Sequence, residues 1–251
     1  MKNKLLAECN WPKLTKKYDI ALRMSIDYIL ENYKPIGIIA SGTIIRGTPD
    51  ESSDLDIYVI HNEPFRQRLQ KYFNGVPAEI FINPPFQVEK YFEEEQASRR
   101  PLTAHMLSTG YDILDIDPII KKLRKKAEGF LLEPPEAPKE SIYQRYLIAL
   151  LYEDAVDVVG KDPYTANMIA NRAVVEMLNF CFVKAGKFIP RQKSLLDELE
   201  KVDENVAKLV RSFYQETDIA EKVELAGKIS DLVVGERGFF EWESSPDEVM
   251  K

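Results

Sequence analysis

The sequence predicts an α/β domain with a small mixed sheet, followed by an all-α helical bundle. Short β-branched runs alternate with helical patterns in the first half, and no strand pattern follows in the second half. Between them, residues 131–139 hold three prolines in nine positions. We therefore expect a first domain at 1–130, a proline-rich linker at 131–139 and a helical bundle domain at 140–251.

The first helix and the first strand are separated by a proline. Apolar residues recur at mostly helical spacing over 14–33, and Pro35 is expected to end that helix. The run at 36–41 is short, rich in β-branched residues and bounded by Gly42, which is typical of a buried strand.

Two more strands and an intervening helix are expected next. Residues 54–60 alternate strictly between two faces, as a strand does. The pattern at 63–75 predicts a helix that stops at Asn74-Gly75, and 77–83 predicts a third strand.

The remaining elements are mostly helical. In the first domain we expect two helices with a break near Pro101, a last edge strand at 111–116 and a basic helix at 118–130. The second domain is expected to hold four or five helices, over 141–160, 162–186, 194–202, 204–215 and 218–243.

Composition limits the classes of partner. The chain has 251 residues, a formal net charge of −7, 45% hydrophobic and 30% charged residues, which are ordinary values for a folded globular protein. A broad grip on nucleic acid needs a basic surface, so no nucleic-acid partner is expected.

No segment indicates a membrane or an oxidising compartment. No apolar run approaches the roughly 18 residues that span a bilayer, and the N-terminal residues do not resemble a signal peptide. Cys9 and Cys181 form neither a disulfide framework nor a CxxC metal pair. We expect a cytoplasmic protein with two plain thiols.

Asp54 and Asp56 are the first candidate functional residues. They lie two apart on one strand, so their carboxylates project from the same face. Two carboxylates held that close repel each other, and a divalent cation relieves the repulsion. Mg²⁺ prefers oxygen ligands and keeps positions open for phosphate oxygens, so one or two Mg²⁺ ions are the expected cofactor.

A glycine turn precedes this pair. Ser41, Gly42 and Thr43 close the first strand, where Gly42 lets the backbone turn tightly and lets a phosphate approach. Thr43 supplies a hydroxyl at the expected start of a short helix, and Arg46 follows within one turn. Glu79, on a strand that could pair beside 54–60, is the candidate third carboxylate.

These residues form a recognisable pattern. Gly42-Thr43, Arg46-Gly47 and the Ser-Asp-Leu-Asp-Ile run at 53–57 resemble the nucleotidyltransferase superfamily typified by DNA polymerase β. With its helical second half, the chain also resembles the small adenylyltransferases that modify aminoglycoside or lincosamide antibiotics. The residues that carry this resemblance in sequence lie only within about 36–83.

The resemblance implies a role for each motif residue. Gly42 and Thr43 would hold the triphosphate, Asp54 and Asp56 would bind Mg²⁺, and Glu79 would complete the metal site. Serine is commoner than Thr43 in the family, and aspartate is commoner than Glu79, so the third ligand is less firmly implied than the first two.

Each of these residues also has an ordinary structural explanation. Paired acids on a strand usually face solvent, and Glu79 could be a plain exposed strand glutamate. Arg46 could hold phosphate or pair with a nearby carboxylate.

Two further candidates come from the second half. Glu153, in a Leu-Tyr-Glu run similar to the base-bearing helix of aminoglycoside adenylyltransferases, is the candidate general base, although a solvated acidic helix face explains it slightly better. Lys193, before an expected helix, could reach the nucleotide phosphates or simply lie on the surface.

Together these observations predict a Mg²⁺-dependent nucleotidyltransferase. The expected reaction moves a nucleoside monophosphate, AMP from ATP, to a hydroxyl of a small molecule, in a cleft between the two domains. Two alternatives stay open, namely a nucleotidyltransferase that modifies a protein such as a toxin partner, and a catalytically silent nucleotide-binding or scaffold protein. The sequence also leaves a homodimer open.

Overall fold

A mixed five-stranded sheet forms the centre of the first of two units. The computed structural model describes residues 2–138, 141–244 and 246, and its contacts divide the chain into residues 1–134 and 135–251. The strands are β1 (Pro35–Ser41), β2 (Leu55–His61), β3 (Gln67–Phe73), β4 (Val76–Asn83) and β5 (Tyr111–Asp115). Their order in the sheet is β3-β4-β2-β1-β5.

The strand directions make this sheet mixed. β2 and β4 are parallel, whereas β1 pairs antiparallel with β2 and β5, and β3 pairs antiparallel with β4. The predicted strands at 36–41, 54–60, 77–83 and 111–116 are present, with small shifts at their ends. The last of them is an edge strand, as expected.

The prediction of a helix at 63–75 was wrong. Residues Gln67–Phe73 form β3, which lies at the sheet edge with most of its side chains exposed. Asn74 and Gly75 both have positive φ, 50° and 72°, and join β3 to β4 as a tight hairpin. Asn-Gly between two strands is a strong hairpin signal, and it was taken for a helix stop.

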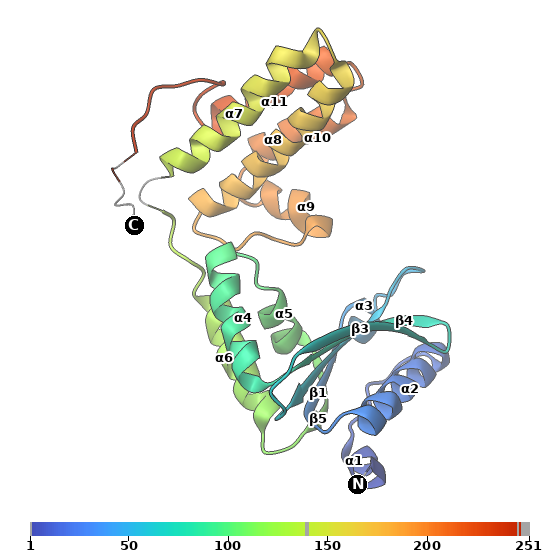
Figure 1. Ribbon diagram of the computed structural model, residues 1–251. Coiled ribbons are helices and arrows are strands. Elements are labelled where there is room, and N and C mark those ends of the chain that lie inside the picture. The colour runs from blue at the N-terminus through green and yellow to red at the C-terminus, as the bar shows by residue number, and fades with distance from the viewer. Residues whose placement is uncertain (1, 139–140, 245, 247–251) are drawn as a thin grey trace. The chain divides into compact units, whose positions relative to one another are not determined.

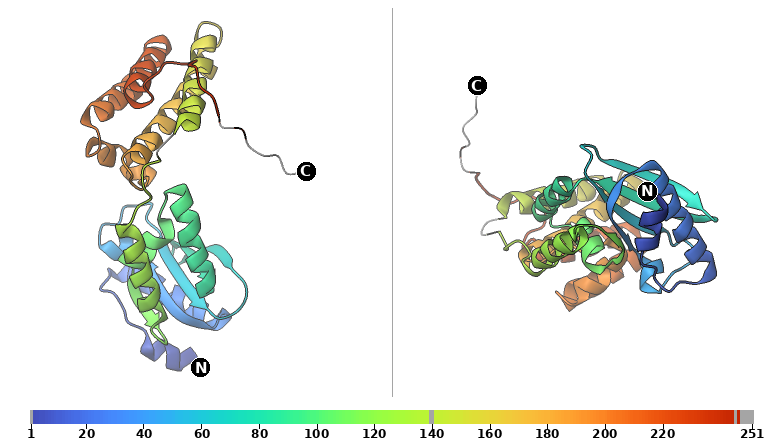
Figure 2. Two further views of the ribbon diagram at one scale, coloured as in Figure 1. Left: turned by 90° about the vertical axis from the view of Figure 1, so that its left-hand side faces the viewer. Right: turned by 90° about the horizontal axis from the view of Figure 1, so that it is seen from below.

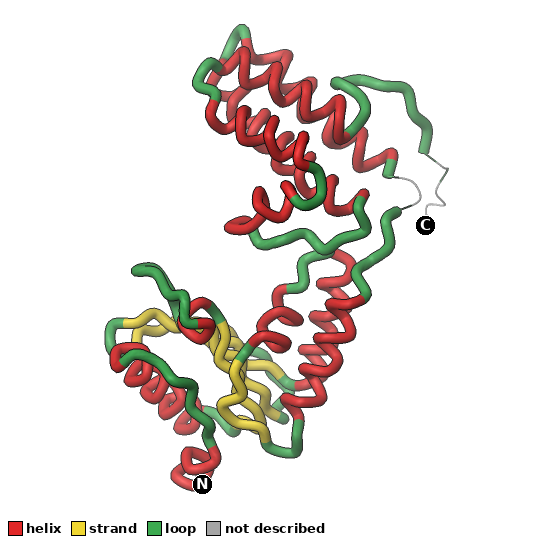
Figure 3. Tube along the Cα trace, turned by 180° about the vertical axis from the view of Figure 1, so that it is seen from behind, coloured by secondary structure: helices red, strands yellow, loops and turns green. Residues whose placement is uncertain are grey.

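Helices cover both faces of the sheet (Figures 1 and 3). The helices of this unit are α1 (Lys2–Glu8), α2 (Lys16–Asn32), α3 (Thr43–Arg46), α4 (Pro85–Ser98), α5 (Leu102–Thr109) and α6 (Ile119–Leu132). The inward stripe of α2 packs with Leu55, Ile57 and Val59 of β2 in one core. Tyr58 and Ile60, which point the opposite way, pack with α4, α5 and α6 in another. The alternation at 54–60 therefore separates two buried faces.

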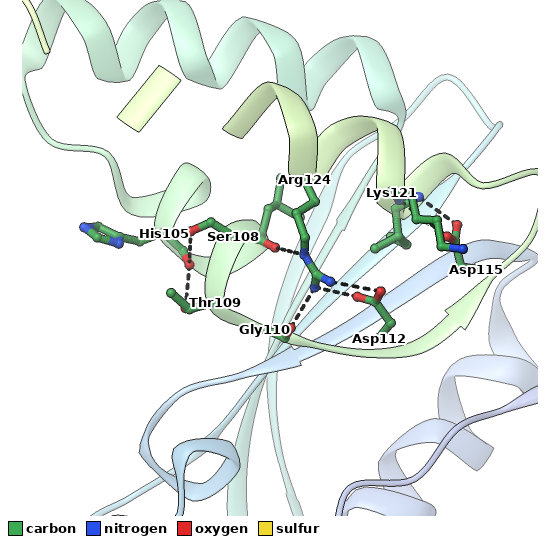
Figure 4. Close-up of polar contacts among 10 residues, drawn as sticks. His105, Ser108, Thr109, Gly110, Asp112, Asp115, Lys121 and Arg124 are labelled. Carbon is green, nitrogen blue, oxygen red and sulfur yellow. Dashed lines mark hydrogen bonds and ion pairs between the residues drawn. The ribbon is translucent and has the colours of Figure 1, made fainter. Parts of the chain in front are cut away.

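Arg124 ties α6 to the sheet. Its guanidinium donates hydrogen bonds to the backbone oxygens of Leu107 and Gly110, at 3.0 and 2.7 Å, and to both carboxylate oxygens of Asp112 on β5 (Figure 4). The Asp115 carboxylate accepts from the Ile120 amide at 2.8 Å and so caps the first turn of α6.

The described residues of the second unit form helices and loops, with no strand among them. It holds α7 (Ile142–Val159), α8 (Pro163–Lys184), a 3₁₀ turn (Gln192–Ser194), α9 (Leu195–Glu200), α10 (Glu204–Gln215) and α11 (Ile219–Val233). α8 packs along both α7 and α11, which are visible beside it in Figures 1 and 2. One apolar core, which includes Met177, Phe180 and Phe213, fills the space between the helices.

Aspartates start three of these helices. Asp162, Asp203 and Asp218 each accept a hydrogen bond from a backbone amide in the first turn of α8, α10 and α11. The helix expected at 218–243 ends earlier, at Val233. The segment that follows passes through Gly235 and Gly238, whose φ values of 87° and 75° do not continue a helix.

Candidate active site

Three carboxylates gather where β2 and β4 run side by side. Asp54 precedes β2, Asp56 lies on it, and Glu79 on β4 is the register partner of Asp56. One carboxylate oxygen from each residue lies within 4.8 Å of those from the other two, and all three residues are partly exposed. We call these three residues the acidic triad. The strand with Glu79 pairs beside the strand with Asp56, as expected.

Two members of the triad, Asp56 and Glu79, belong to one row across the sheet. The backbone register aligns Ser41 of β1 with Asp56, Asp56 with Glu79, and Glu79 with Gln70 of β3. Side chains opposite each other in neighbouring strands lie close together, so this row brings polar groups from four strands to one place.

Two donors hold one oxygen of Glu79. The Arg68 side chain reaches Glu79 Oε1 through Nε at 2.7 Å and through Nη2 at 2.5 Å, and Gln70 Nε2 donates to the same oxygen at 3.0 Å. The Glu79 side chain is 13% exposed, whereas that of Arg68 is 65% exposed. The carboxylate is therefore fixed by groups at the sheet edge.

Gly42 lies directly against the triad. It has φ of +90° and ψ of −175°, a conformation that essentially only glycine adopts. A Cβ at this position would lie 2.8 Å from Asp56 Oδ2. The absence of a side chain thus lets the turn after β1 approach the carboxylate that it faces.

The Thr43 hydroxyl is held by the loop before β2. Thr43 Oγ1 lies 2.9 Å from Ser53 Oγ, which in turn donates to Asp50 Oδ1 at 2.9 Å. The Thr48 amide donates to the Thr43 carbonyl oxygen at 3.0 Å. Arg46, at the end of α3, is exposed. The structure thus brings Ser41, Gly42 and Thr43 to the same edge of the sheet as the triad.

Glu153 and Lys193 belong to the second unit. Glu153 lies on α7 and lines a cavity in that unit, and Lys193 lies exposed in the 3₁₀ turn before α9. Their roles in nucleotide chemistry stay predictions.

Sequence reasoning missed Arg68 and Gln70, and it included Ser53 in the motif without giving it a role. The first two were assigned to a helix, in which they would not share a face. With Asn74-Gly75 taken as a hairpin, residues two apart on β3 point the same way. Arg68 and Gln70 would then have been expected beside the Glu79 face.

The cysteines lie outside this site. Both are buried, and burial raises the pKa of Cys9 to about 11 and that of Cys181 to about 12. Both groups therefore stay protonated thiols at neutral pH, which agrees with plain core positions.

The donor set of the triad suits a hard divalent cation. All three ligands are carboxylate oxygens, the type that Mg²⁺ prefers, and three such groups this close together repel one another without a cation. Within the described ranges of the chain, no other group of three acidic, histidine or cysteine side chains converges in this way. The triad can therefore bind a metal ion.

Among residues 2–138, 141–244 and 246, no helix is both long enough and apolar enough to cross a bilayer.

Comparison with known proteins gives a match in structure only. No protein-family model matches the chain, and no curated protein matches it in sequence. The chain is similar to the crystal structure of a nucleotidyltransferase-like protein from Exiguobacterium sibiricum 255-15, with a TM-score of 0.50 and 15% sequence identity. The alignment covers 86% of this chain and 73% of that chain.

This match agrees with the predicted fold. The predicted fold class is confirmed, with a mixed five-stranded sheet and its helices followed by a helical region. The chain therefore shares the fold of that nucleotidyltransferase-like protein.

Proposed function

We propose that the protein is a Mg²⁺-dependent nucleotidyltransferase that moves a nucleoside monophosphate from a nucleoside triphosphate, ATP, to a hydroxyl of a small molecule. The observation that carries the proposal is the acidic triad packed against Gly42, with its three carboxylates within 4.8 Å of one another. The nucleotidyltransferase-like fold supports a nucleotide as the substrate.

The triad is proposed to bind the metal ion, and the turn after β1 is proposed to bind the phosphates. Asp54, Asp56 and Glu79 would hold Mg²⁺, which would neutralise charge on the α-phosphate and on the leaving pyrophosphate. Gly42 leaves room for phosphate oxygens beside Asp56, and the Thr43 hydroxyl lies at the same turn. Ser41, Arg46 and Lys193 are the further proposed contacts to the nucleotide.

The transfer itself is a balanced displacement at phosphorus. The acceptor oxygen forms a bond to the α-phosphorus, the bond from that phosphorus to the pyrophosphate oxygen breaks, and the hydroxyl proton passes to a base. Glu153 is the proposed base. The chain's own contribution is to fix the triphosphate relative to the triad, so that attack and departure lie in line.

Release of pyrophosphate tests the reaction. The full-length protein would be incubated with Mg²⁺ and labelled ATP, GTP or CTP, with aminoglycosides, lincosamides or cell-extract proteins as acceptors. We expect release with ATP and a small hydroxyl compound, and its loss in Asp54→Asn and Asp56→Asn. Labelling of a protein instead would favour the protein-modifying alternative. No release with any acceptor would favour the silent scaffold.

The metal assignment has its own control. Asp50→Asn changes a carboxylate in the neighbouring loop, which bonds Ser52 and Ser53 and does not belong to the triad. We expect Asp50→Asn to keep Mg²⁺-dependent ATP binding. Binding that survives unchanged in Asp54→Asn and Asp56→Asn would show that the triad does not hold the metal.

A further inference from the structure

The two carboxylate oxygens of Glu79 have different surroundings. Arg68 contacts Oε1 through Nε at 2.7 Å and through Nη2 at 2.5 Å, and Gln70 Nε2 donates to the same oxygen at 3.0 Å. Among the residues that the structure describes, no donor contacts Oε2. One oxygen of this carboxylate is therefore engaged by the sheet edge, and the other is left to a ligand.

The three nitrogen atoms fill the hydrogen-bonding capacity of Oε1. A carboxylate oxygen offers about two lone-pair sites, and three N–H donors already share them on Glu79 Oε1. A cation that bound to Oε1 would have to displace a donor and would lie against the positive guanidinium of Arg68, which repels it. Glu79 can therefore offer only Oε2 to a metal ion while Arg68 and Gln70 stay in place.

Arg68 is held in position although its side chain is exposed. The guanidinium carbon lies 4.8 Å from the ring centroid of Phe81, and ring faces attract such cations. Phe81 in turn stacks on the buried ring of Tyr58, with centroids 5.8 Å apart and 15° between the ring planes. Gln70 is the register partner of Glu79 across β3 and β4. Both contacts to Oε1 are therefore fixed by the sheet and by an aromatic stack.

This restraint matters because Glu79 is a glutamate. Its side chain has one more rotatable bond than an aspartate, so without the restraint it could turn both oxygens toward one cation. Ca²⁺ accepts about six to eight oxygen ligands in a loose geometry and often takes both oxygens of a carboxylate, whereas Mg²⁺ demands a near-ideal octahedron. The number and the flexibility of the ligands decide which of the two ions a site prefers.

We propose that Arg68 and Gln70 make the acidic triad selective for Mg²⁺ over Ca²⁺, because they restrict Glu79 to ligation through Oε2 alone. They are positioning residues, which act through Glu79 and contact neither the metal ion nor the nucleotide. The inference rests on the metal site of the proposed function, and it is independent of the acceptor and of the helical unit.

Calorimetric titration with Mg²⁺ and with Ca²⁺, without nucleotide, tests the proposal. The full-length parent protein, Arg68→Met, Gln70→Met and the double variant would each be titrated with both ions. The informative quantity is the ratio of the Ca²⁺ dissociation constant to the Mg²⁺ dissociation constant. Loss of a positive charge strengthens binding of both ions, whereas a second available oxygen on Glu79 favours Ca²⁺. Gln70→Met frees one contact to Oε1 without any change of charge.

We expect this ratio to fall roughly tenfold in the double variant, which is the size of one charge-assisted contact, and to fall less in each single variant. Lys71→Met is the matched control. It removes a positive charge from the same strand, but the Lys71 ammonium lies on the opposite face, 4.9 Å from the ring centroid of Tyr28. Its ratio should equal that of the parent protein. Both Arg68 and Gln70 are exposed, so the variants should fold, and circular dichroism checks this.

Three outcomes would overturn the proposal. Equal strengthening of both ions in the double variant would show that Arg68 acts only through its charge. A ratio that stays the same with unchanged affinities would show that Oε1 takes no part. A fall in Lys71→Met as large as that in the double variant would show that the contacts to Oε1 are not the cause.

Pyrophosphate release by the parent protein separates this proposal from the proposed function. Release together with an unchanged ratio in the double variant would overturn the selectivity and leave the transfer reaction standing. A shifted ratio without release for any acceptor would support the selectivity and overturn the transfer reaction.

Discussion

Arg68 reaches one carboxylate oxygen of Glu79, Oε1, with two guanidinium nitrogens, Nε at 2.7 Å and Nη2 at 2.5 Å. This places a positive charge from the edge strand β3 beside the acidic triad. In the absence of a metal ion, Arg68 is the counter-charge that offsets the repulsion among the three carboxylates.

Removal of the Arg68 side chain should therefore lower the stability of the protein most when no metal ion is bound. We expect Arg68→Ala to lower the melting temperature in EDTA by about 1–3 °C, because the Arg68 side chain is solvent-exposed and ion pairs with an exposed partner contribute modestly. Saturating Mg²⁺ should remove most of this difference in melting temperature between the variant and the parent protein. Arg66→Ala is the control, since Arg66 bonds Tyr91 and not the triad. An equal loss with and without Mg²⁺ would contradict the counter-charge role.

Gly42→Ala should damage the site more than Gly47→Ala. Both glycines have positive φ, so both variants suffer backbone strain of about 1 kcal/mol or more. Only at Gly42 would the new Cβ lie 2.8 Å from Asp56 Oδ2, whereas nothing lies within 4 Å at Gly47. Calorimetric titration should show that Gly42→Ala loses Mg²⁺ binding and that Gly47→Ala retains it. Equal retention by the two variants would show that Asp56 tolerates a side chain there.

His61 should make stability fall in mild acid. The imidazole is buried, with Nε2 2.9 Å from the Phe65 carbonyl oxygen, and burial lowers its pKa from the ordinary value of 6.5. The unfolded chain binds the proton more readily, so the contribution of neutral His61 is present above about pH 6.5 and is lost as the pH falls through the lowered pKa.

Denaturant unfolding between pH 5 and 7 measures this effect. His61→Gln should flatten the dependence of the unfolding free energy on pH. His105→Gln, which alters an exposed histidine, should leave it unchanged. If the slopes of the parent protein and His61→Gln are the same, His61 does not titrate in this range.

Arg124→Met should destabilise the first unit. It removes the donor that satisfies two backbone oxygens and the Asp112 carboxylate, all partly buried, and we expect a loss of about 2 kcal/mol or more. Lys125→Met, at an exposed position on the same helix, is the control. In a double-mutant cycle, Asp112→Asn should recover part of the loss, because no charge is then left unpaired. Simple additivity of the two changes would contradict a shared ion pair.

The central strands could be predicted because buried strands carry a recognisable pattern of apolar side chains. Residues 36–41 and 54–60 carry β-branched or alternating apolar side chains, and the register that places Asp56 beside Glu79 needs only that β2 and β4 be neighbours. β3 was missed because an exposed edge strand has little apolar periodicity, so a polar run such as 67–73 also fits a helix. Arg68 and Gln70, the partners of Glu79 on β3, were therefore not predicted either.

The cavity in the helical unit was beyond sequence reasoning for a different reason. Glu153 was selected from α7, but its neighbours Glu241 and Trp242 follow the last helix and lie far along the chain. No periodicity connects residues that meet only because Gly238 packs against α7.

The row that aligns Ser41, Asp56 and Glu79 has a kinetic consequence. The three residues come from β1, β2 and β4, so the site is complete only after strands distant in sequence have paired, which is a slow type of contact to form. A cation that needs all three residues in place binds the native state, and it binds partly folded states only weakly. Bound Mg²⁺ should then lengthen the lifetime of the folded protein by slowing its unfolding, while the rate of folding stays nearly the same.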